Sequence, residues 1–283
     1  MENLKAIKDR IRTVDSIIKA TSAMKMVSTV KLAKINNANK YSKECSDILF
    51  DMFSRAVREV VFKQEFNEEP WFYRKNGETL IIVISMDQGF CGSFSQGIID
   101  KANDIIKNNP NAYVEVFGKK GSDIFQKTLD IGISRDLTSR YDIDVFSSLL
   151  AKLVFKYIHD YNINEVYVVS GEFKNVLVQK ARSLKIFPVD LNKDITKEQY
   201  TSVEGSHLNF IDNVFQMYLS KLFKGIVTEH LISELSARVM AMDNSVRNAN
   251  DMFEKLNVLY NRVRQARITQ ELTEIVSSIE CVQ

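Results

Sequence analysis

The placement of glycine and proline constrains the fold of this chain more than any other feature. All ten glycines and all three prolines lie between Pro70 and Gly225. Because these residues cost roughly 1 and 3 kcal/mol in a helix interior, the outer segments can continue as long helices. We therefore predict three domains: an N-terminal helix over 1–69, a central α/β domain over 70–205 and a C-terminal helix over 206–283.

Both outer segments carry apolar residues at alternating steps of three and four, which is the spacing of a coiled-coil seam. Because the segments lie at opposite ends of the chain with a domain between them, we expect them to pair as an antiparallel coiled coil. Two ordinary amphipathic helices packed on the central domain are the alternative. The seam positions are Leu4, Ile7, Ile11, Val14, Ile18, Thr21, Lys25, Ser28, Leu32 and Ile35 in the first segment, and Leu235, Val239, Met242, Val246, Ala249, Phe253, Leu256, Tyr260 and Val263 in the second.

The first seam is interrupted in its middle, where Thr21, Lys25 and Ser28 replace branched aliphatic residues. Polar residues in a seam lower stability and can fix the register of the two helices. This stretch is therefore either a loosely packed part of the coiled coil or a contact zone for a partner.

The end of the second segment carries apolar residues that have no cover within the chain, because this helix outreaches its partner. Exposed apolar surface of this kind marks a partner site. We therefore expect the tip of the C-terminal helix to lie in a socket formed by another protein. The residues are Ile268, Leu272, Ile275, Val276 and Ile279.

Positive charge is concentrated in the outer segments, although the formal net charge of the whole chain is only +2. Residues 1–43 contain ten Lys or Arg and three acidic residues, and Arg262, Arg264 and Arg267 cluster near the other end. A basic rod suits an acidic protein sleeve or a nucleic-acid backbone, whereas a solvated helix face is the simpler interpretation.

The middle of the chain alternates strand and helix patterns, which predicts a mostly parallel sheet covered by helices. The run TLIIVISM at 79–86 is typical of a buried parallel strand. We expect further strands at 112–117, 165–169, 173–180 and 185–189, and helices at about 97–108, 119–129 and 144–161.

Catalytic chemistry has no visible place in this sequence. The glycine-rich turn DQGFCGSFS at 87–95 follows the first strand, but it matches no established phosphate-binding motif, and a tight turn explains it. Cys91 has no histidine patterned with it, and no Cys or His spacing suggests a metal. Cys45, Cys91 and Cys281 are odd in number and widely spaced, which indicates reduced thiols. We predict no catalytic, cofactor-binding or metal-binding residues.

Several separated motifs, in order along almost the whole chain, resemble those of the gamma subunit of F-type ATP synthase. The stretch at 259–276 is the most specific of them. The motifs are IKDRI at 7–11, AMKMVS at 23–28, MDQGFCG at 86–92, SELSARVMAM at 233–242 and LYNRVRQARITQELTEIV at 259–276.

The resemblance implies a Rossmann-like domain carried by an antiparallel coiled coil. It implies a central-stalk rotor subunit that couples proton-driven rotation of the membrane ring to ATP synthesis or hydrolysis. The implied partners are the alpha3beta3 hexamer, the epsilon subunit and the membrane c-ring. Nucleotide binds to alpha and beta in this family, so the resemblance implies no catalysis, cofactor, nucleic acid or small-molecule substrate for this chain.

The resemblance also implies partner-contact residues. Arg264, Gln265, Thr269 and Glu271 match positions where the C-terminal helix of the family engages a loop of beta. Met24 and Lys25 match the N-terminal segment near the lever of the catalytic domain. Departures occur at Gln88, Phe90 and the tail residues 278–279.

The N-terminus continues directly into a helix pattern with Glu2 and Asp9, which resembles neither a signal peptide nor a mitochondrial presequence. No run of about 18 apolar residues is long enough to span a bilayer. Together with the resemblance, this favours a peripheral protein on the cytoplasmic face of a bacterial inner or plasma membrane over one in a mitochondrial inner membrane.

Two other functions remain open at this point. The first is a nucleotide-binding enzyme that uses the Gly89–Gly92 turn and dimerises through a coiled-coil arm. The second is a basic coiled coil that binds nucleic acid, for which the sequence offers no groove-reading motif.

Overall fold

The computed structural model describes residues 4–38, 42–63, 70–73, 76–125, 134–135, 142–189 and 207–280. The chain forms two compact units, which we call the helical unit (Met1–Val30 with Arg238–Gln283) and the α/β unit (Lys31–Ala237). This grouping reflects contacts between residues, and the division into three domains by sequence stays a prediction.

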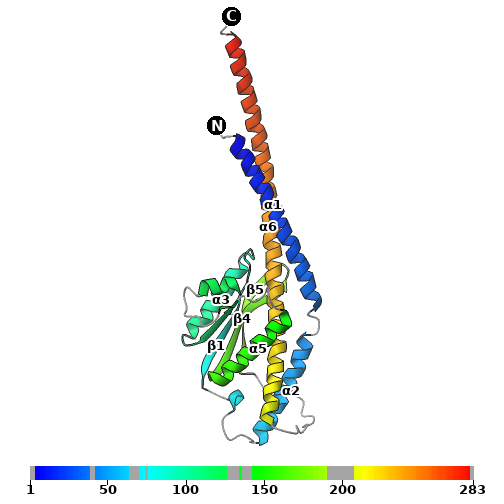
Figure 1. The fold of residues 1–283 in the computed structure, drawn as a ribbon, viewed down its shortest axis with the longest axis vertical. Coiled ribbons are helices and arrows are strands. Elements are labelled where there is room, and N and C mark those ends of the chain that lie inside the picture. Colours follow the sequence, from blue (N-terminus) through cyan, green and yellow to red (C-terminus); the bar gives the residue numbers. More distant parts are fainter. Residues whose placement is uncertain are drawn as a thin grey trace. The chain divides into compact units, whose positions relative to one another are not determined.

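Three helices account for the outer segments of the chain: α1 (Leu4–Ala38), α2 (Ser42–Lys63) and α6 (His207–Glu280). In the helical unit, α1 and the second half of α6 run in opposite directions (Figure 1). Helix α6 continues for 74 residues and contains Gly225, because one glycine costs only about 1 kcal/mol in a helix. None of the described helices has the combination of length and apolar character that crossing a membrane requires.

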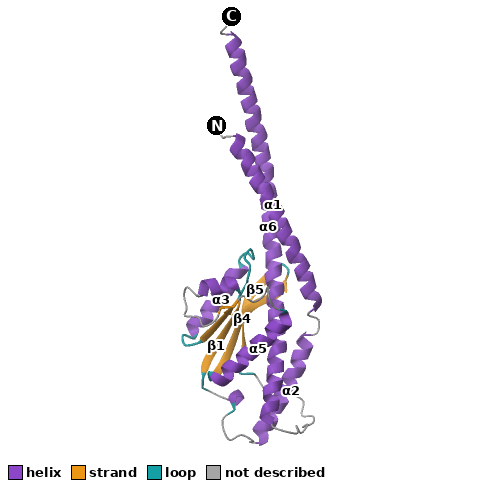
Figure 2. Cartoon of the chain, viewed as in Figure 1, coloured by secondary structure: helices purple, strands orange, loops and turns teal. Residues whose placement is uncertain are grey.

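The α/β unit is built on a five-stranded sheet in the order β3-β2-β1-β4-β5 (Figure 2). Strands β1 (Glu78–Ile84), β2 (Tyr113–Phe117), β3 (Ser134–Arg135) and β4 (Ile163–Asn175) pair in parallel, and β5 (Val178–Phe187) is antiparallel to β4. The prediction of a mostly parallel sheet covered by helices is confirmed.

Helices bury both faces of this sheet, and the period of two along β1 explains how. Ile81 and Val83 point to one face, where they pack with residues of α3 (Phe94–Asn108) and α4 (Lys119–Phe125). Leu80, Ile82 and Ile84 point to the other face, where they join a larger core. Because every residue from Leu80 to Ile84 is buried, the strand is a continuous apolar run and shows no alternation with polar residues.

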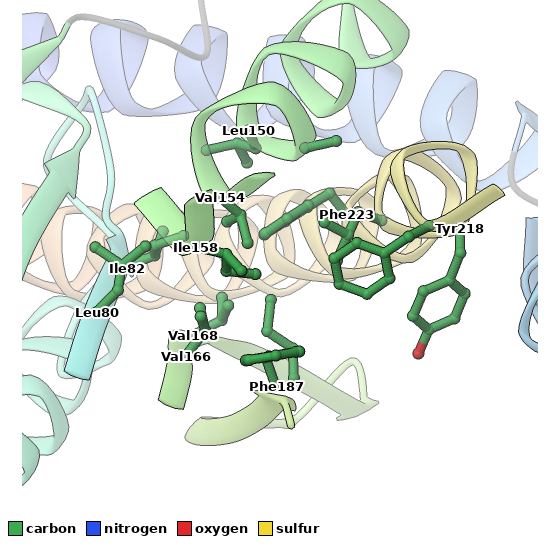
Figure 3. Packing of buried hydrophobic residues seen from close by; sticks show 14 of the residues in the cluster. Leu80, Ile82, Leu150, Val154, Ile158, Val166, Val168, Phe187, Tyr218 and Phe223 are labelled. Atoms are coloured by element: carbon green, nitrogen blue, oxygen red, sulfur yellow. The ribbon is translucent and has the colours of Figure 1, made fainter. Parts of the chain in front are cut away.

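The larger core is formed by the sheet together with α2, α5 (Ile143–Asp160) and the first part of α6 (Figure 3). Its residues include Leu150, Val154 and Ile158 of α5 and Phe223 of α6. Trp71, the only tryptophan of the chain, lies in this core 4.6 Å from the ring of Phe215. Its indole Nε1 donates a hydrogen bond to Asp212 at 2.8 Å. Trp71 is therefore a spectroscopic probe of the α/β unit.

The second half of the sheet differs from the prediction. Three short strands at 165–169, 173–180 and 185–189 were expected, but β4 and β5 are two long strands of one hairpin. The turn between them contains neither glycine nor proline, and the Asn175 side chain closes it by accepting hydrogen bonds from the amides of Leu177 and Val178. Gly171 does not interrupt β4, because it serves close packing: a Cβ there would lie 2.5 Å from the Phe94 ring.

Candidate partner-binding surface on the helical unit

The predicted seam residues form the contact between α1 and α6 in the helical unit. Ile7, Val14 and Ser28 of α1 and Met242 of α6 are buried. The other seam positions of both helices within this unit are partly buried, whereas most residues between them are exposed. The two apolar seams therefore face each other, as their spacing predicts.

An ion pair between α1 and α6 shows which residues of the two helices lie at the same level. The Lys25 ammonium bonds to the Asp243 carboxylate, and Arg247 contacts the same carboxylate at 2.8 Å from the next turn of α6. The hydrogen bond from Lys25, aided by the positive charge of Arg247, lowers the pKa of Asp243. Because the helices are antiparallel, Leu4, which is 21 residues before Lys25, lies level with Arg264, which is 21 residues after Asp243.

The burial pattern of α6 changes at this level. Val263 is the last partly buried residue, and every residue from 264 to 277 is exposed. From Arg264 to the end of α6 this tip extends by about 25 Å, at about 1.5 Å per residue. Within it, Ile268, Leu272, Ile275 and Val276 are 48%, 58%, 55% and 54% exposed. The prediction of uncovered apolar residues is confirmed for these four; the Ile279 side chain lies outside the described residues.

The apolar residues of the tip do not continue the seam. Beyond Val263, the seam spacing leads to Arg267, Gln270 and Glu274, which are polar and exposed. At about 100° per residue, the four apolar residues lie roughly 150° around the helix from these positions. The tip therefore carries a separate apolar face, and α1 would not cover this face even if α1 were longer.

The predicted contact residues of α6 are placed around this apolar face. Arg264 and Glu271 lie along one edge, Gln265 lies within it and Thr269 lies along the other edge, at about 100° per residue. All four are exposed. The Thr269 hydroxyl donates to the Gln265 carbonyl at 3.0 Å, and Glu271 accepts a bond from Arg267 at 2.9 Å. These contacts stay within α6.

The two predicted residues of α1 lie elsewhere on the unit. Met24 is 42% exposed, and Lys25 is held by Asp243. Asp243 is about 30 Å along α6 from Arg264, at about 1.5 Å per residue. The structure therefore places the six residues in two separate groups, one at the tip of α6 and one in the middle of the helix pair.

Sequence reasoning missed part of the surface around Met24. Ile17, Met26, Val27 and Val30 are 46%, 70%, 55% and 66% exposed and extend an apolar patch along α1. These residues could have been identified from the sequence, because they are apolar but do not occupy seam positions. Asp243 was also missed, since nothing in its local sequence indicates the lysine that it contacts.

The glycine-rich turn of the α/β unit has the features of a tight turn. Phe90 and Gly92 have φ angles of 66° and 58°, and Cys91 is 2% exposed within the smaller core. The Cys91 thiol lies 3.5 Å from the Gly89 carbonyl oxygen. A buried thiol facing a carbonyl oxygen is not set up for nucleophilic attack. Among the residues that the structure describes, no group of His, Cys, Asp and Glu side chains could hold a metal ion.

A pocket of about 400 Å³ lies between α3 and β5. The carboxylates of Asp100 and Asp104 line it together with Lys101 and Lys180. Because these charges balance, the pocket offers no excess positive charge for a phosphate group.

Comparisons with known proteins by sequence indicate one family, and comparison by structure agrees with it. A family model described as ATP synthase matches residues 3–282. The ATP synthase gamma chains of Rickettsia felis and Rickettsia typhi are 32% and 30% identical, and the matches cover 100% of this chain and of each relative. A chain in the structure of Euglena gracilis mitochondrial ATP synthase has a TM-score of 0.67 at 16% identity, with 99% of this chain and 94% of that chain covered, which shows a shared fold.

The fold and the exposed tip define a class of protein that combines an antiparallel helix pair with an α/β unit built on a mostly parallel sheet. The chain belongs to the ATP synthase gamma chain family. Membership assigns it to the rotor of an ATP synthase, and a nucleotide-binding enzyme with a coiled-coil arm is not favoured.

Proposed function

We propose that this chain is the central-stalk subunit that couples proton-driven rotation of the membrane ring to ATP synthesis or hydrolysis at alpha and beta sites, without catalysis of its own. The observation that carries the proposal is the tip of α6, where residues 264–277 are exposed and the apolar face is separate from the seam. Exposed apolar surface of this kind marks contact with another protein.

The tip has different chemistry on its two sides, and this asymmetry gives rotation a physical effect. Apolar groups occupy one side, and Arg267, Gln270 and Glu274 occupy the other. A rotating tip therefore presents a different surface to each beta subunit in turn. Differential contact free energy with the conformations of a beta subunit shifts its equilibrium between binding states.

The residues that carry this contact are those around the apolar face. Arg264 and Glu271 supply opposite charges at one edge, and Gln265 and Thr269 supply uncharged polar groups. Met24 and Lys25 form the second contact zone, in which Met24 joins the exposed apolar residues Val27 and Val30 of α1. The partners in both zones are subunits of the alpha3beta3 hexamer.

The finer features of the fold belong to the same proposal. Alternating parallel strands and helices support a Rossmann-like domain over 70–205. Facing seams support an antiparallel coiled coil formed by the helices over 1–69 and 206–283. The epsilon subunit and the membrane c-ring are the partners of the α/β domain.

The same proposal places the protein at the periphery of a membrane, on the cytoplasmic face of a bacterial inner or plasma membrane. Attachment would come through the complex. The gamma chains of Rickettsia felis and Rickettsia typhi, which are bacterial relatives, support this location over a mitochondrial inner membrane.

The experiment is to purify the tagged chain from its native membranes and to record the co-purifying subunits, the magnesium-dependent ATPase activity and ATP-driven proton pumping. Deletion of residues 268–283 should weaken assembly or coupling while the thermal transition of the α/β unit, followed by Trp71, stays unchanged. Recovery of the wild-type chain alone, without alpha- and beta-type subunits, would refute the rotor function.

A matched pair of substitutions tests the contact residues. Arg264→Ala should weaken the contact with the beta subunit by about tenfold or more and thereby lower the coupling of ATPase activity to pumping, because a hydrogen bond to a charged group contributes about 1.5–3 kcal/mol. Gln270→Ala removes an exposed polar side chain from the side of α6 opposite the apolar face and should leave coupling unchanged. Equal effects of the two substitutions would contradict the proposed orientation of the contact.

A further inference from the structure

The ion pair between Lys25 and Asp243 joins the two helices of the helical unit. Lys25 of α1 contacts Asp243 of α6, 218 residues away along the chain. Four further ion pairs of this unit lie within a single helix; these are Arg12–Asp9, Lys19–Asp15, Arg247–Asp243 and Arg267–Glu271. Contacts within a helix leave its position along the neighbouring helix unaffected, whereas a contact between helices determines it.

The apolar seams do not specify one register by themselves. A heptad seam looks nearly the same after a shift of seven residues, because one aliphatic residue replaces another. Lys25 breaks this repetition, since it occupies a seam position between Thr21 and the buried Ser28.

The sequence around the pair penalises a shift by one heptad. In one direction the shift places Lys25 opposite Asn250 and Asp243 opposite Leu32. In the other direction Asp243 comes opposite Ile18. Both shifts leave a carboxylate against an apolar side chain, which is costly without a compensating partner.

A shift by four residues is penalised as well. One direction brings the Lys25 ammonium opposite the Arg247 guanidinium, which is a like charge, and the other brings it opposite Val239. The observed register is therefore the one among these five in which Lys25 and Asp243 meet an opposite charge.

We propose that Lys25 and Asp243 are positioning residues that fix the register of α1 against α6 and thereby decide which residues of α6 remain uncovered at the tip. The consequence for activity rests on the proposed rotor function, whereas the register itself is a property of the isolated chain.

The link between register and tip is geometric. Leu4 now lies level with Arg264, so Gln265 and the residues after it extend beyond α1. A slip by one heptad moves α1 by about 10 Å, at about 1.5 Å per residue. In one direction α1 would reach the level of Glu271 and cover Arg267 and Gln270 on the seam side of the tip, and in the other it would uncover the seam side of α6 from Val258 onwards.

The register can be measured by pulsed electron paramagnetic resonance on the full chain. Nitroxide labels are attached to cysteines introduced at Lys8 and Asp251, which are exposed on α1 and α6, after replacement of the native cysteines. We expect a single distance distribution for the labelled chain in which Lys25 and Asp243 are unchanged. Asp243→Asn and Lys25→Met should each produce a second population in which the axial offset of the labels differs by about 10 Å, the length of one heptad.

Two variants make the test specific. Asp15→Asn removes the exposed Lys19–Asp15 pair, which lies within α1, and should leave a single distribution. The mirror-charge variant carries Lys25→Glu, Asp243→Lys and Arg247→Glu. It should restore the single distribution, because each charge changes sign and the two helices still attract each other at this position. A single unshifted distribution in both Asp243→Asn and Lys25→Met would overturn the proposal, and so would failure of the mirror-charge variant to restore it in a chain with native helix content.

The outcome is independent of the rotor function. A register shift without any change in coupling, measured in complexes that contain Asp243→Asn, would leave the register inference standing and would count against its proposed consequence for partner contact. A chain that binds no alpha or beta subunit would refute the rotor function and leave the distance measurement unaffected.

Discussion

His230 is expected to make the α/β unit lose stability as the pH falls. Its side chain is 0% exposed, and its Nδ1 accepts a hydrogen bond from the Gly171 amide at 3.0 Å. Burial lowers the pKa of His230 from 6.5 to about 4, which outweighs the opposing effects of the Ser85 backbone and the Asp87 charge. The Glu234 carboxylate lies 3.9 Å from the other ring nitrogen.

The sign and size of the effect follow from proton linkage. As the pH falls below 6.5, the unfolded chain binds a proton at this residue, whereas the native chain stays neutral until the pH reaches about 4. The contribution of His230 to stability is therefore complete above pH 6.5 and decreases as the pH falls through this window. Each pH unit between the two pKa values costs at most about 1.4 kcal/mol, so the total is about 3 kcal/mol.

The assay is urea unfolding at several pH values between 7.5 and 4, followed by Trp71 fluorescence. His230→Gln removes the titrating group. It should therefore reduce the slope of the free energy of unfolding against pH by the amount that corresponds to close to one bound proton. His159→Gln is the matched control, because the His159 side chain is 32% exposed. Its ring lies 5.6 Å from that of Trp71, so unfolding of this control and of the wild-type chain is also followed by far-ultraviolet circular dichroism. Equal slopes for the wild-type chain and His230→Gln between pH 6.5 and 4 would refute the argument.

Two predictions concern packing and buried hydrogen bonds. Gly171→Ala should lower the free energy of unfolding by about 1–3 kcal/mol, because the new Cβ would lie 2.5 Å from the buried Phe94 ring. Tyr157→Phe should lower it by a similar amount, about 1–3 kcal/mol, because the Tyr157 hydroxyl donates a 2.6 Å hydrogen bond to the buried Glu115 carboxylate. Both are measured by chemical unfolding at pH 7.5.

Matched substitutions provide their controls. Gly97→Ala lies within α3, where the nearest atom to the new Cβ is 3.8 Å away, so it should be neutral or raise stability by up to about 1 kcal/mol. Tyr161→Phe removes a hydroxyl from an exposed neighbour of Tyr157 and should change stability by less than about 0.5 kcal/mol. If either control is as destabilising as its counterpart, the corresponding contact is not the cause.

Local patterns were sufficient for much of this protein. The absence of glycine and proline from the outer segments predicted long helices, and the run at 79–86 predicted the central strand that the structure places at Glu78–Ile84. These predictions succeed because helix and strand periodicities are properties of short stretches of chain. The exposed tip of α6 was also foreseeable, because the C-terminal helix was expected to extend beyond the N-terminal helix that pairs with it.

Turns without special residues were not foreseeable. The Asn175 side chain closes the β4–β5 hairpin by accepting hydrogen bonds from two backbone amides, and the turn contains no glycine or proline that would indicate it in the sequence. The expected break near Gly171 was wrong for the opposite reason, because that glycine makes room for a neighbouring ring within a continuous strand.

The sequence by itself determined the long helices, the central strand, the seam positions within each helix and the motifs that indicate the family, because each depends on residues that are close together along the chain. Tertiary structure alone decided that Lys25 meets Asp243 and that His230 is enclosed beside Gly171. These features depend on contacts between residues far apart in sequence. No local pattern encodes such contacts, because they form only when the chain folds and its helices and strands pack against one another.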